Sequence, residues 1–263
     1  MPRLNRRQFL GGVGVALAAA RPGTPASQPK RLLITSAHSR LAQSLAAGLQ
    51  DKYQDRLTER VPVQTGFEFV PCALERDPAT NLLVRGTDGI VHVAEPLPGE
   101  TEKQQLDRLA CGTHNLLWAA LEERVPRLVF LSTLELMTAY DFNFTVNESW
   151  RPRPTCDAWV LAKHLGEFTC REFAREGKIS IVVLRLGKVV RSEEVAGKPF
   201  DPLWVEERDV TRAVTAALSA TFTDTAVSLS GWSIFHIGSD GPRARFSVAR
   251  AKSELAYHPQ FNW

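Results

Sequence analysis

The chain has 263 residues, of which 44% are hydrophobic, and this is enough for one large α/β domain with a full core. Its net charge is only +3, and no basic patch is interleaved with aromatic residues, so nucleic acid is not expected as a partner. The four cysteines and six histidines lie far apart without the spacing of metal ligands, so no metal site is predicted.

The first residues have the pattern of an export signal. Arg6 and Arg7 stand ahead of a short apolar run, GGVGVALAAA, which a Pro- and Ser-containing stretch follows. This order is typical of a signal peptide, and NRRQFL is similar to the twin-arginine signal. The run is too short and too rich in glycine to span a bilayer as a helix. We therefore expect a signal peptide and linker over residues 1–30 and a periplasmic protein. The alternative is the basic amphipathic start of a cytoplasmic protein.

The rest of the chain alternates short apolar strands with helical segments. The expected strands are residues 32–35, 56–59, 67–70, 90–93, 127–133 and 179–187. Leucines at helical spacing predict a first helix that includes residues 41–49, and longer helices are expected over 101–124 and 157–176. This alternation predicts an α/β fold, in which βαβ units build a parallel sheet that is covered on both faces.

Several segments lie in the same order as the motifs of one enzyme family. They are LLITSAHSRLAQSL, TDGIVHVAEP, CGTHNLLWAA, RLVFLST, WVLAKHLGE, VLRLGKVV, WVEERDVTRAVTAAL and AKSELAYHPQFNW. Together they resemble the extended short-chain dehydrogenase/reductases, the NAD-dependent sugar epimerase/dehydratase family. The resemblance covers about residues 31–263 and implies a single Rossmann-like domain, a doubly wound parallel sheet with a small C-terminal substrate-side region. The ending and the compact length are most similar to uronate dehydrogenase-type members.

The first strand–turn–helix is where this family holds the cofactor pyrophosphate. Its GxxGxxG turn supplies a tight bend, a close phosphate approach and tight helix packing. Here the three positions are Ser36, Ser39 and Ala42. A positive φ at Ser36 costs about 1–2 kcal/mol, and Ser39 adds a hydroxyl where phosphate oxygens would lie. NAD binding is therefore expected to be weak or absent. The alternative is that the serine hydroxyls, helped by Arg40 or His38, still hold phosphate.

The residue at the end of the second expected strand is the one that distinguishes NAD from NADP in this family. The resemblance matches Glu59 to the acid that accepts hydrogen bonds from the adenosine ribose, with Arg60 beside it. A carboxylate there would repel a 2′-phosphate, so NAD is expected rather than NADP. The alternative is a solvated Glu59-Arg60 charge pair. Where the family usually has an aspartate near the adenine, this chain has Cys72-Ala73-Leu74.

The resemblance also locates the catalytic positions. In this family a tyrosine moves the proton, a lysine four residues later assists it, and a Ser or Thr orients the substrate oxygen. Lys163 is present, but Trp159 stands four residues before it, on the same helix face. An indole cannot act as acid and base, a role worth about 10²–10⁴-fold in rate. The hydroxyl position falls on Leu134, and a shift of one residue makes Thr133 the match. Tyr140 is the nearby phenol that would have to substitute.

The substrate side should be formed by three segments, as the resemblance implies: residues 141–155, 190–205 and 231–245. Trp150 and Trp204 are candidates to stack on a sugar ring, and Arg243 to meet a carboxylate or phosphate. Trp232 and Arg245 are further candidates of the same two kinds.

Three functions compete. The first is a non-catalytic relative, which binds a nucleotide or a sugar. The second is an active NAD-dependent oxidoreductase or epimerase on a sugar or uronate, with an altered site; export in the folded state favours it, because a held cofactor would travel with the protein. The third is a periplasmic interaction module without a small ligand. The sequence leaves a homodimer open.

Overall fold

A sheet of seven parallel strands forms the centre of the protein, in a computed structural model that describes residues 30–176, 179–221 and 231–263. The strands are β1 (Lys30–Thr35), β2 (Tyr53–Glu59), β3 (Glu68–Pro71), β4 (Gly89–His92), β5 (Arg127–Thr133), β6 (Ser180–Leu186) and β9 (Trp232–Ile237). Their spatial order is β3-β2-β1-β4-β5-β6-β9. This confirms the predicted doubly wound parallel sheet. Because the order reverses between β1 and β4, the carboxyl ends of these two strands flank a crevice, where ligands bind in such sheets.

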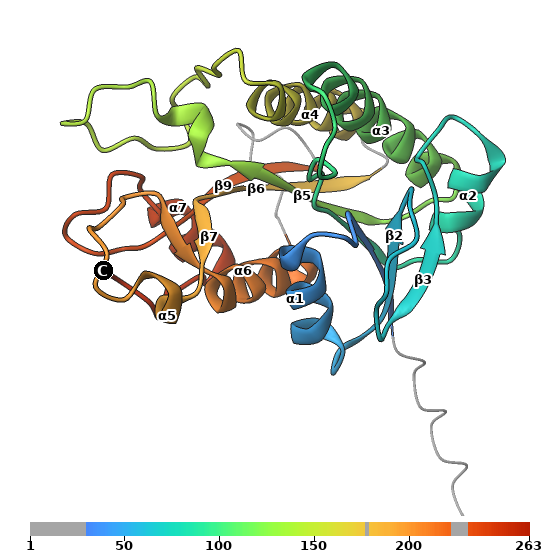
Figure 1. Cartoon of the computed structure of the whole chain (residues 1–263), viewed down its shortest axis with the longest axis horizontal. Helices are drawn as coiled ribbons and strands as arrows, with labels where there is room; N and C mark the ends of the chain where they lie inside the picture. Colours follow the sequence, from blue (N-terminus) through green and yellow to red (C-terminus); the bar gives the residue numbers. More distant parts are fainter. Residues whose placement is uncertain (1–29, 177–178, 222–230) are drawn as a thin grey trace, which may run out of the picture.

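Helices cover both faces of the sheet (Figure 1). On one face lie α2 (Pro78–Val84), α3 (Glu102–Glu122) and α4 (Ala158–Arg175), and on the other α1 (Arg40–Leu49), α6 (Glu207–Ser219) and α7 (Ala249–Leu255). Each strand therefore needs apolar side chains on both sides. In β1, Leu32 and Ile34 belong to the core under α1 and α6, whereas Leu33 belongs to the core under α3 and α4. This explains the continuous apolar runs of the sequence.

One expected strand was too short. β2 begins at Tyr53 rather than at Arg56, because its first residue pairs with Lys30, the first residue of β1. Polar side chains such as Gln54 hid this part of the strand from an analysis of apolar runs. The expected helices over 101–124 and 157–176 are confirmed to within two residues at each end.

A glycine lets α4 approach the sheet closely. A Cβ atom at Gly166 would lie 2.5 Å from Cζ of Phe130 in β5, so no larger residue fits there without movement. Asp157 is the N-cap of this helix, and its side chain accepts the N–H of Val160. The start and the close approach together place Trp159 and Lys163 over the carboxyl ends of the central strands.

A second, small sheet stands beside these ends. It pairs β7 (Lys188–Val190) with β8 (Trp204–Glu206), and the short α5 (Ser192–Val195) lies between them in the sequence. The short 3-10 helix η1 (Leu134–Met137) follows β5 directly. The expected export signal lies outside the described residues.

None of the helices within residues 30–176, 179–221 and 231–263 is both long and apolar enough to cross a membrane. In those same ranges, no group of three or more His, Cys, Asp or Glu side chains is placed to hold a metal ion.

Candidate functional site

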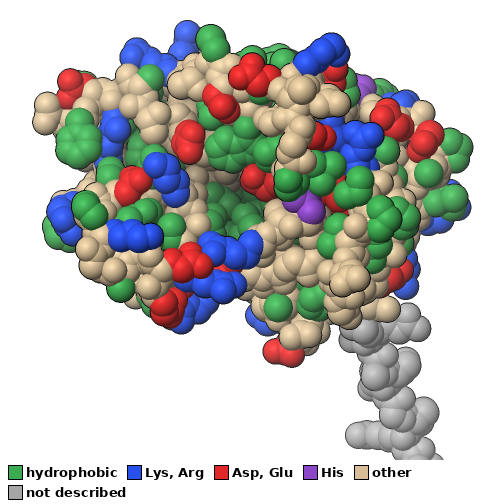
Figure 2. Space-filling model, viewed as in Figure 1, with side chains coloured by type: hydrophobic (Ala, Val, Ile, Leu, Met, Phe, Trp, Pro, Cys, Tyr) green, Lys and Arg blue, Asp and Glu red, His purple; other side chains and the backbone are tan. Residues whose placement is uncertain are grey.

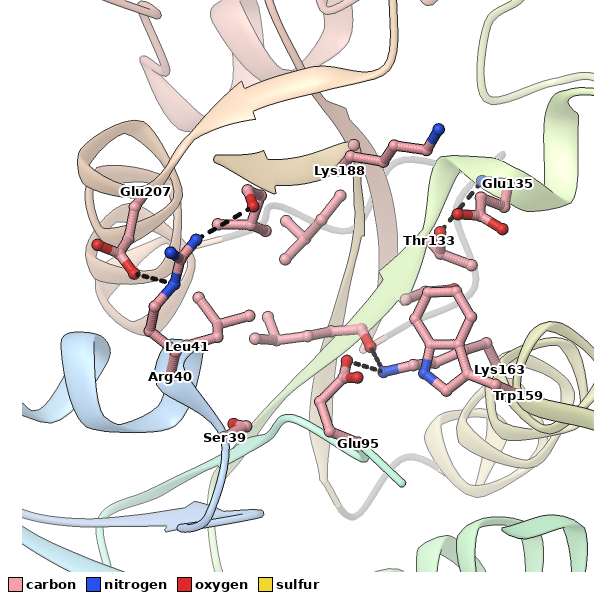
Figure 3. A pocket seen from close by; sticks show the side chains of 15 residues that line it. Ser39, Arg40, Leu41, Glu95, Thr133, Glu135, Trp159, Lys163, Lys188 and Glu207 are labelled. Carbon is pink, nitrogen blue, oxygen red and sulfur yellow. Dashed lines mark hydrogen bonds and ion pairs between the residues drawn. The ribbon is translucent and has the colours of Figure 1, made fainter. Parts of the chain in front are cut away.

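A cavity of about 280 Å³ opens at the carboxyl ends of β5 and β6, beside the start of α1. Figure 2 shows a hollow on this side of the molecule, with hydrophobic side chains at its floor and charged ones around it. The lining residues are Ser39, Arg40, Leu41, Glu95, Leu131, Ser132, Thr133, Glu135, Trp159, Lys163, Leu186, Gly187, Lys188, Val189 and Glu207. The sequence-predicted residues Ser39, Arg40, Thr133, Trp159 and Lys163 are thus brought together (Figure 3).

The turn after β1 has the strained shape that the glycine pattern implies. Ser36 has a φ of 59°, in the left-handed region that favours glycine. Its buried hydroxyl accepts the N–H of Glu95, at 3.0 Å. Ser39 is the N-cap of α1, and its hydroxyl accepts the N–H of Ala42, at 3.2 Å. Both hydroxyls therefore already hold backbone groups of the protein.

Arg40, expected to supply charge to a phosphate, lies across the mouth of the cavity instead. Its guanidinium pairs with Glu194 of α5, at 2.5 Å, and with Glu207 of α6, at 3.5 Å. These pairs join the start of α1 to α5 and to α6, and Figure 3 shows the pair with Glu207. A phosphate at this end of α1 would have to displace them.

The carboxylate expected to bind the ribose is engaged inside the protein. Oε2 of Glu59 lies 2.5 Å from Nδ1 of His38, and Oε1 accepts the N–H of Arg60, at 2.8 Å. The other ring nitrogen of His38 lies 3.0 Å from the carbonyl oxygen of Pro96. Burial by itself lowers the pKa of His38, but the hydrogen bond and charge of Glu59, with the Pro96 carbonyl, raise it overall. Sequence analysis missed this pairing.

On the side that the resemblance assigns to adenine, an open cavity of about 320 Å³ is lined by Arg60, Ala73, Leu74, Arg108 and Asn115, among others. A separate cavity there is lined by Glu59, Cys72, Ala73, Leu74 and Arg108, among others, and measures about 20 Å³. That is room for roughly one water molecule. This small cavity and the one of about 280 Å³ share no lining residue.

Lys163 is buried, with 2% of its side chain exposed, and its ammonium group meets three acceptors. It donates to the carbonyl oxygens of Val93, at 2.6 Å, and Leu131, at 2.8 Å. Its Nζ also lies 3.4 Å from Oε1 of Glu95 (Figure 3). Burial lowers the pKa of Lys163, and the charge of Glu95 opposes that shift. Lys163 thus joins the ends of β4 and β5. Sequence analysis missed Glu95, although its place two residues after an apolar strand end was a usable signal.

Trp159 lies one helical turn before Lys163 and lines the cavity. Its ring centroid is 5.5 Å from Nζ of Lys163. Its Nε1 is buried and has no hydrogen-bond partner among the residues that the structure describes. The indole therefore offers the cavity an aromatic surface, and no group that ionises near neutral pH.

Of the two alternatives for the hydroxyl position, the cavity contains Thr133 and not Leu134. Oγ1 of Thr133 accepts the N–H of Glu135, at 3.1 Å, as the N-cap of η1. The side chain of Leu134 is buried in a core cluster with Leu136 and Met137. The structure therefore places Thr133, and not Leu134, at the cavity.

The remaining candidates lie away from the cavity lining. The Tyr140 hydroxyl donates to the carbonyl of Arg151, at 2.7 Å, and its ring packs edge-on against Trp150, with centroids 4.7 Å apart. Trp204 is buried against Phe200 and Trp263, and Arg243 lies over the Phe200 ring. Trp232 packs against the core, and Arg245 donates to the carbonyls of Thr138 and Tyr140. Contacts with other side chains and with backbone carbonyls hold these residues, and none of them lines the cavity.

Comparisons with known proteins agree with this arrangement of the fold. A model of the NAD-dependent epimerase/dehydratase family matches residues 34–221. An NAD-dependent glucose-6-phosphate dehydrogenase of Haloferax volcanii is 23% identical, covering 88% of this chain and 93% of that protein. A uronate dehydrogenase of Pseudomonas syringae pv. tomato is 26% identical, over 72% and 69% of the two chains.

Solved structures share the same fold. Uronate dehydrogenase of Agrobacterium tumefaciens superposes with a TM-score of 0.75, at 23% identity, covering 89% of this chain and 85% of that one. A mutant of that enzyme has been solved in complex with NAD.

Proposed function

Because the chain belongs to the NAD-dependent epimerase/dehydratase family, we propose that its 280 Å³ cavity binds a small sugar-like ligand without the family's tyrosine-dependent hydride transfer. The observation that carries this proposal is Trp159. It occupies the helix position one turn before Lys163, where the family's mechanism needs a phenol that can give and take a proton. An indole does not do this near neutral pH.

The size and lining of the cavity support a ligand of about one sugar ring. Ligand sites usually measure about 300–1,000 Å³, so 280 Å³ suits a small ligand rather than a whole dinucleotide. Leu41, Leu131, Leu186 and the Trp159 indole give it apolar surface, and charged groups surround them. Such a surface can contact the C–H face of a sugar while its hydroxyls meet the polar groups. The matched relatives are also named for sugars, glucose 6-phosphate and uronate.

The cofactor of the family fits this arrangement poorly. Glu59, the ribose acceptor that the resemblance implies, bonds His38, and Lys163 is held by two carbonyls and Glu95. The small cavity that Glu59 lines measures about 20 Å³. NAD binding would require His38 and Glu95 to give up these contacts. We therefore propose that NAD binds weakly or not at all, and no step of the chemistry is assigned to it.

A second candidate is an active NAD-dependent oxidoreductase or epimerase that acts on a sugar or uronate. The named relatives are dehydrogenases, which favours it. In this chain the specific observation is that Glu135 lines the cavity together with Thr133 and Lys163. A carboxylate in that place can accept a proton from a substrate hydroxyl that Thr133 orients.

Isothermal titration calorimetry of the purified protein tests the first candidate. We expect a measurable affinity for a neutral monosaccharide, and an affinity for NAD that is in the high micromolar range or weaker. Replacement of the cavity indole, Trp159→Ala, should weaken sugar binding about tenfold or more, equal to about 1.4 kcal/mol. Trp118→Ala is the matched control, because Trp118 lies on α3 outside the cavity lining. Submicromolar binding of NAD, or sugar binding that Trp159→Ala leaves unchanged, would contradict the proposal.

A further inference from the structure

The cations of the cavity already have partners inside the protein. Three cationic side chains line it: Arg40, Lys163 and Lys188. Arg40 pairs with Glu194 and Glu207, Lys163 with Glu95, and Lys188 with Asp201, at 3.0 Å. Lys163 is held most firmly, since it is buried and also donates to two backbone carbonyls.

One carboxylate of the lining is different. Glu135 stands in η1 at the edge of the cavity, next to Thr133 (Figure 3). Its backbone N–H is bonded to Thr133, but its carboxylate has no hydrogen bond or ion pair with any residue in the described part of the chain. The other two carboxylates of the lining, Glu95 and Glu207, are each ion-paired. The unpaired charge that faces a ligand is therefore negative.

We infer that the cavity prefers a neutral or amino-substituted sugar over a sugar acid or sugar phosphate of the same size. This rests on the proposed function, that a sugar-sized ligand binds here. An anionic ligand would be repelled by the unpaired carboxylate of Glu135. To pair with one of the cations of the lining, it would have to break that cation's existing ion pair, and the released carboxylate would then lie beside the ligand. Juxtaposed like charges are a strong source of discrimination between ligands.

The aromatic wall acts in the same direction. The face of an indole attracts a cation, and Trp159 lines the cavity. An ammonium group on the ligand would thus gain from Glu135 and Trp159 together. The preference is opposite in sign to the glucose 6-phosphate and uronate in the names of the two matched relatives.

The test compares four sugars that differ in one substituent. Glucose, glucosamine, glucuronate and glucose 6-phosphate are titrated calorimetrically into the full chain at one ionic strength, at a pH where the glucosamine amine is protonated. We expect glucosamine to bind at least as tightly as glucose, and both anions to bind at least about tenfold more weakly than glucose.

A matched pair of variants identifies the source of the preference. Glu135→Gln removes the unpaired charge and should bring the affinity for glucuronate to within about threefold of that for glucose. Glu102→Gln removes an exposed carboxylate from the first turn of α3, outside the cavity lining, and should keep the wild-type order. Tighter binding of either anion than of glucose, or an unchanged order in Glu135→Gln, would overturn this inference alone. No binding of any of the four sugars would overturn the proposed function as well.

Discussion

Nδ1 of His38 lies 2.5 Å from Oε2 of Glu59, and this contact joins the turn after β1 to the end of β2. Because the other nitrogen of the ring meets the carbonyl of Pro96, the same side chain also reaches the loop after β4. His38 therefore links the carboxyl ends of three strands, β1, β2 and β4. They enclose the place where the adenosine half of a dinucleotide binds in folds of this kind.

Removal of the His38 side chain should strengthen the binding of NAD. In His38→Ala, Oε2 of Glu59 is free to accept a ribose hydroxyl, so we expect the affinity for NAD to rise about tenfold or more in calorimetric titrations, roughly the value of one hydrogen bond to a charged group. NADP should gain less, because its 2′-phosphate would meet the carboxylate. His114→Ala, an exposed histidine of α3, is the control. An equal or lower NAD affinity in His38→Ala would contradict the role given to this contact.

The stability of the protein should depend on the ionisation of one buried acid. Asp55 in β2 is 6% exposed, and neither of its carboxylate oxygens has a hydrogen-bond partner among the residues that the structure describes. Burial raises its pKa to about 7. A folded-state pKa above the unfolded value means that the protonated acid is favoured by the fold. Its contribution to stability is therefore lost as the pH rises from about 4 to about 7.

Asp55→Asn tests this directly. We expect the free energy of unfolding to increase by about 1 kcal/mol or more near pH 8, where the wild type must bury a charge, and to change little near pH 4. Urea titrations at the two pH values measure it. Asp51→Asn, which removes an exposed acid, should have no such effect at either pH. A stabilisation of Asp55→Asn that is equal at both pH values would show that charge is not the cause.

Lys163 should contribute to stability, whatever it does for a ligand. Lys163→Met leaves the carbonyls of Val93 and Leu131 and the Glu95 carboxylate without their cation, so we expect unfolding to become easier by about 2–4 kcal/mol. Lys188→Met, at an ion pair with a half-exposed lysine, should change stability by no more than about 0.5 kcal/mol. Equal stabilities of the two variants, measured by chemical denaturation, would argue against this structural role.

The framework of the fold was accessible from the sequence, because apolar periodicity reports which faces of each element are buried. The left-handed φ at Ser36 was likewise implied by the glycine pattern that it interrupts. The contacts that occupy the expected cofactor-binding residues could not be predicted from the sequence. His38 and Glu59 are 21 residues apart, and Glu95 and Lys163 lie on different elements, so their pairing depends on how the strand ends are placed in space. For the same reason the sequence could not show that Trp150 and Arg243 lie outside the cavity lining.

Export is a proposal that rests on the first residues alone. Arg6 and Arg7 precede a short apolar run, and we expect Arg6→Lys with Arg7→Lys to retain the precursor in the cytoplasm. Cell fractionation of wild type and the double variant measures this. A variant with Lys30 and Lys52 changed to arginine, outside the signal, is the control for altered basic residues. A wild-type chain that stays in the cytoplasm, or a double variant that still leaves it, would contradict the proposal.

We propose that Trp159 ends the family's proton relay, and the formation of NADH measures this most directly. Wild type, at micromolar concentration with NAD and a panel of uronates, aldoses and nucleotide sugars, should give no NADH absorbance above a control without protein. Trp159→Tyr restores a phenol one turn before Lys163, in the cavity that Thr133 also lines. Combined with His38→Ala, which frees Glu59, this variant should form NADH. Turnover by the wild type at an ordinary enzyme rate, about 1–10³ per second, would contradict the account.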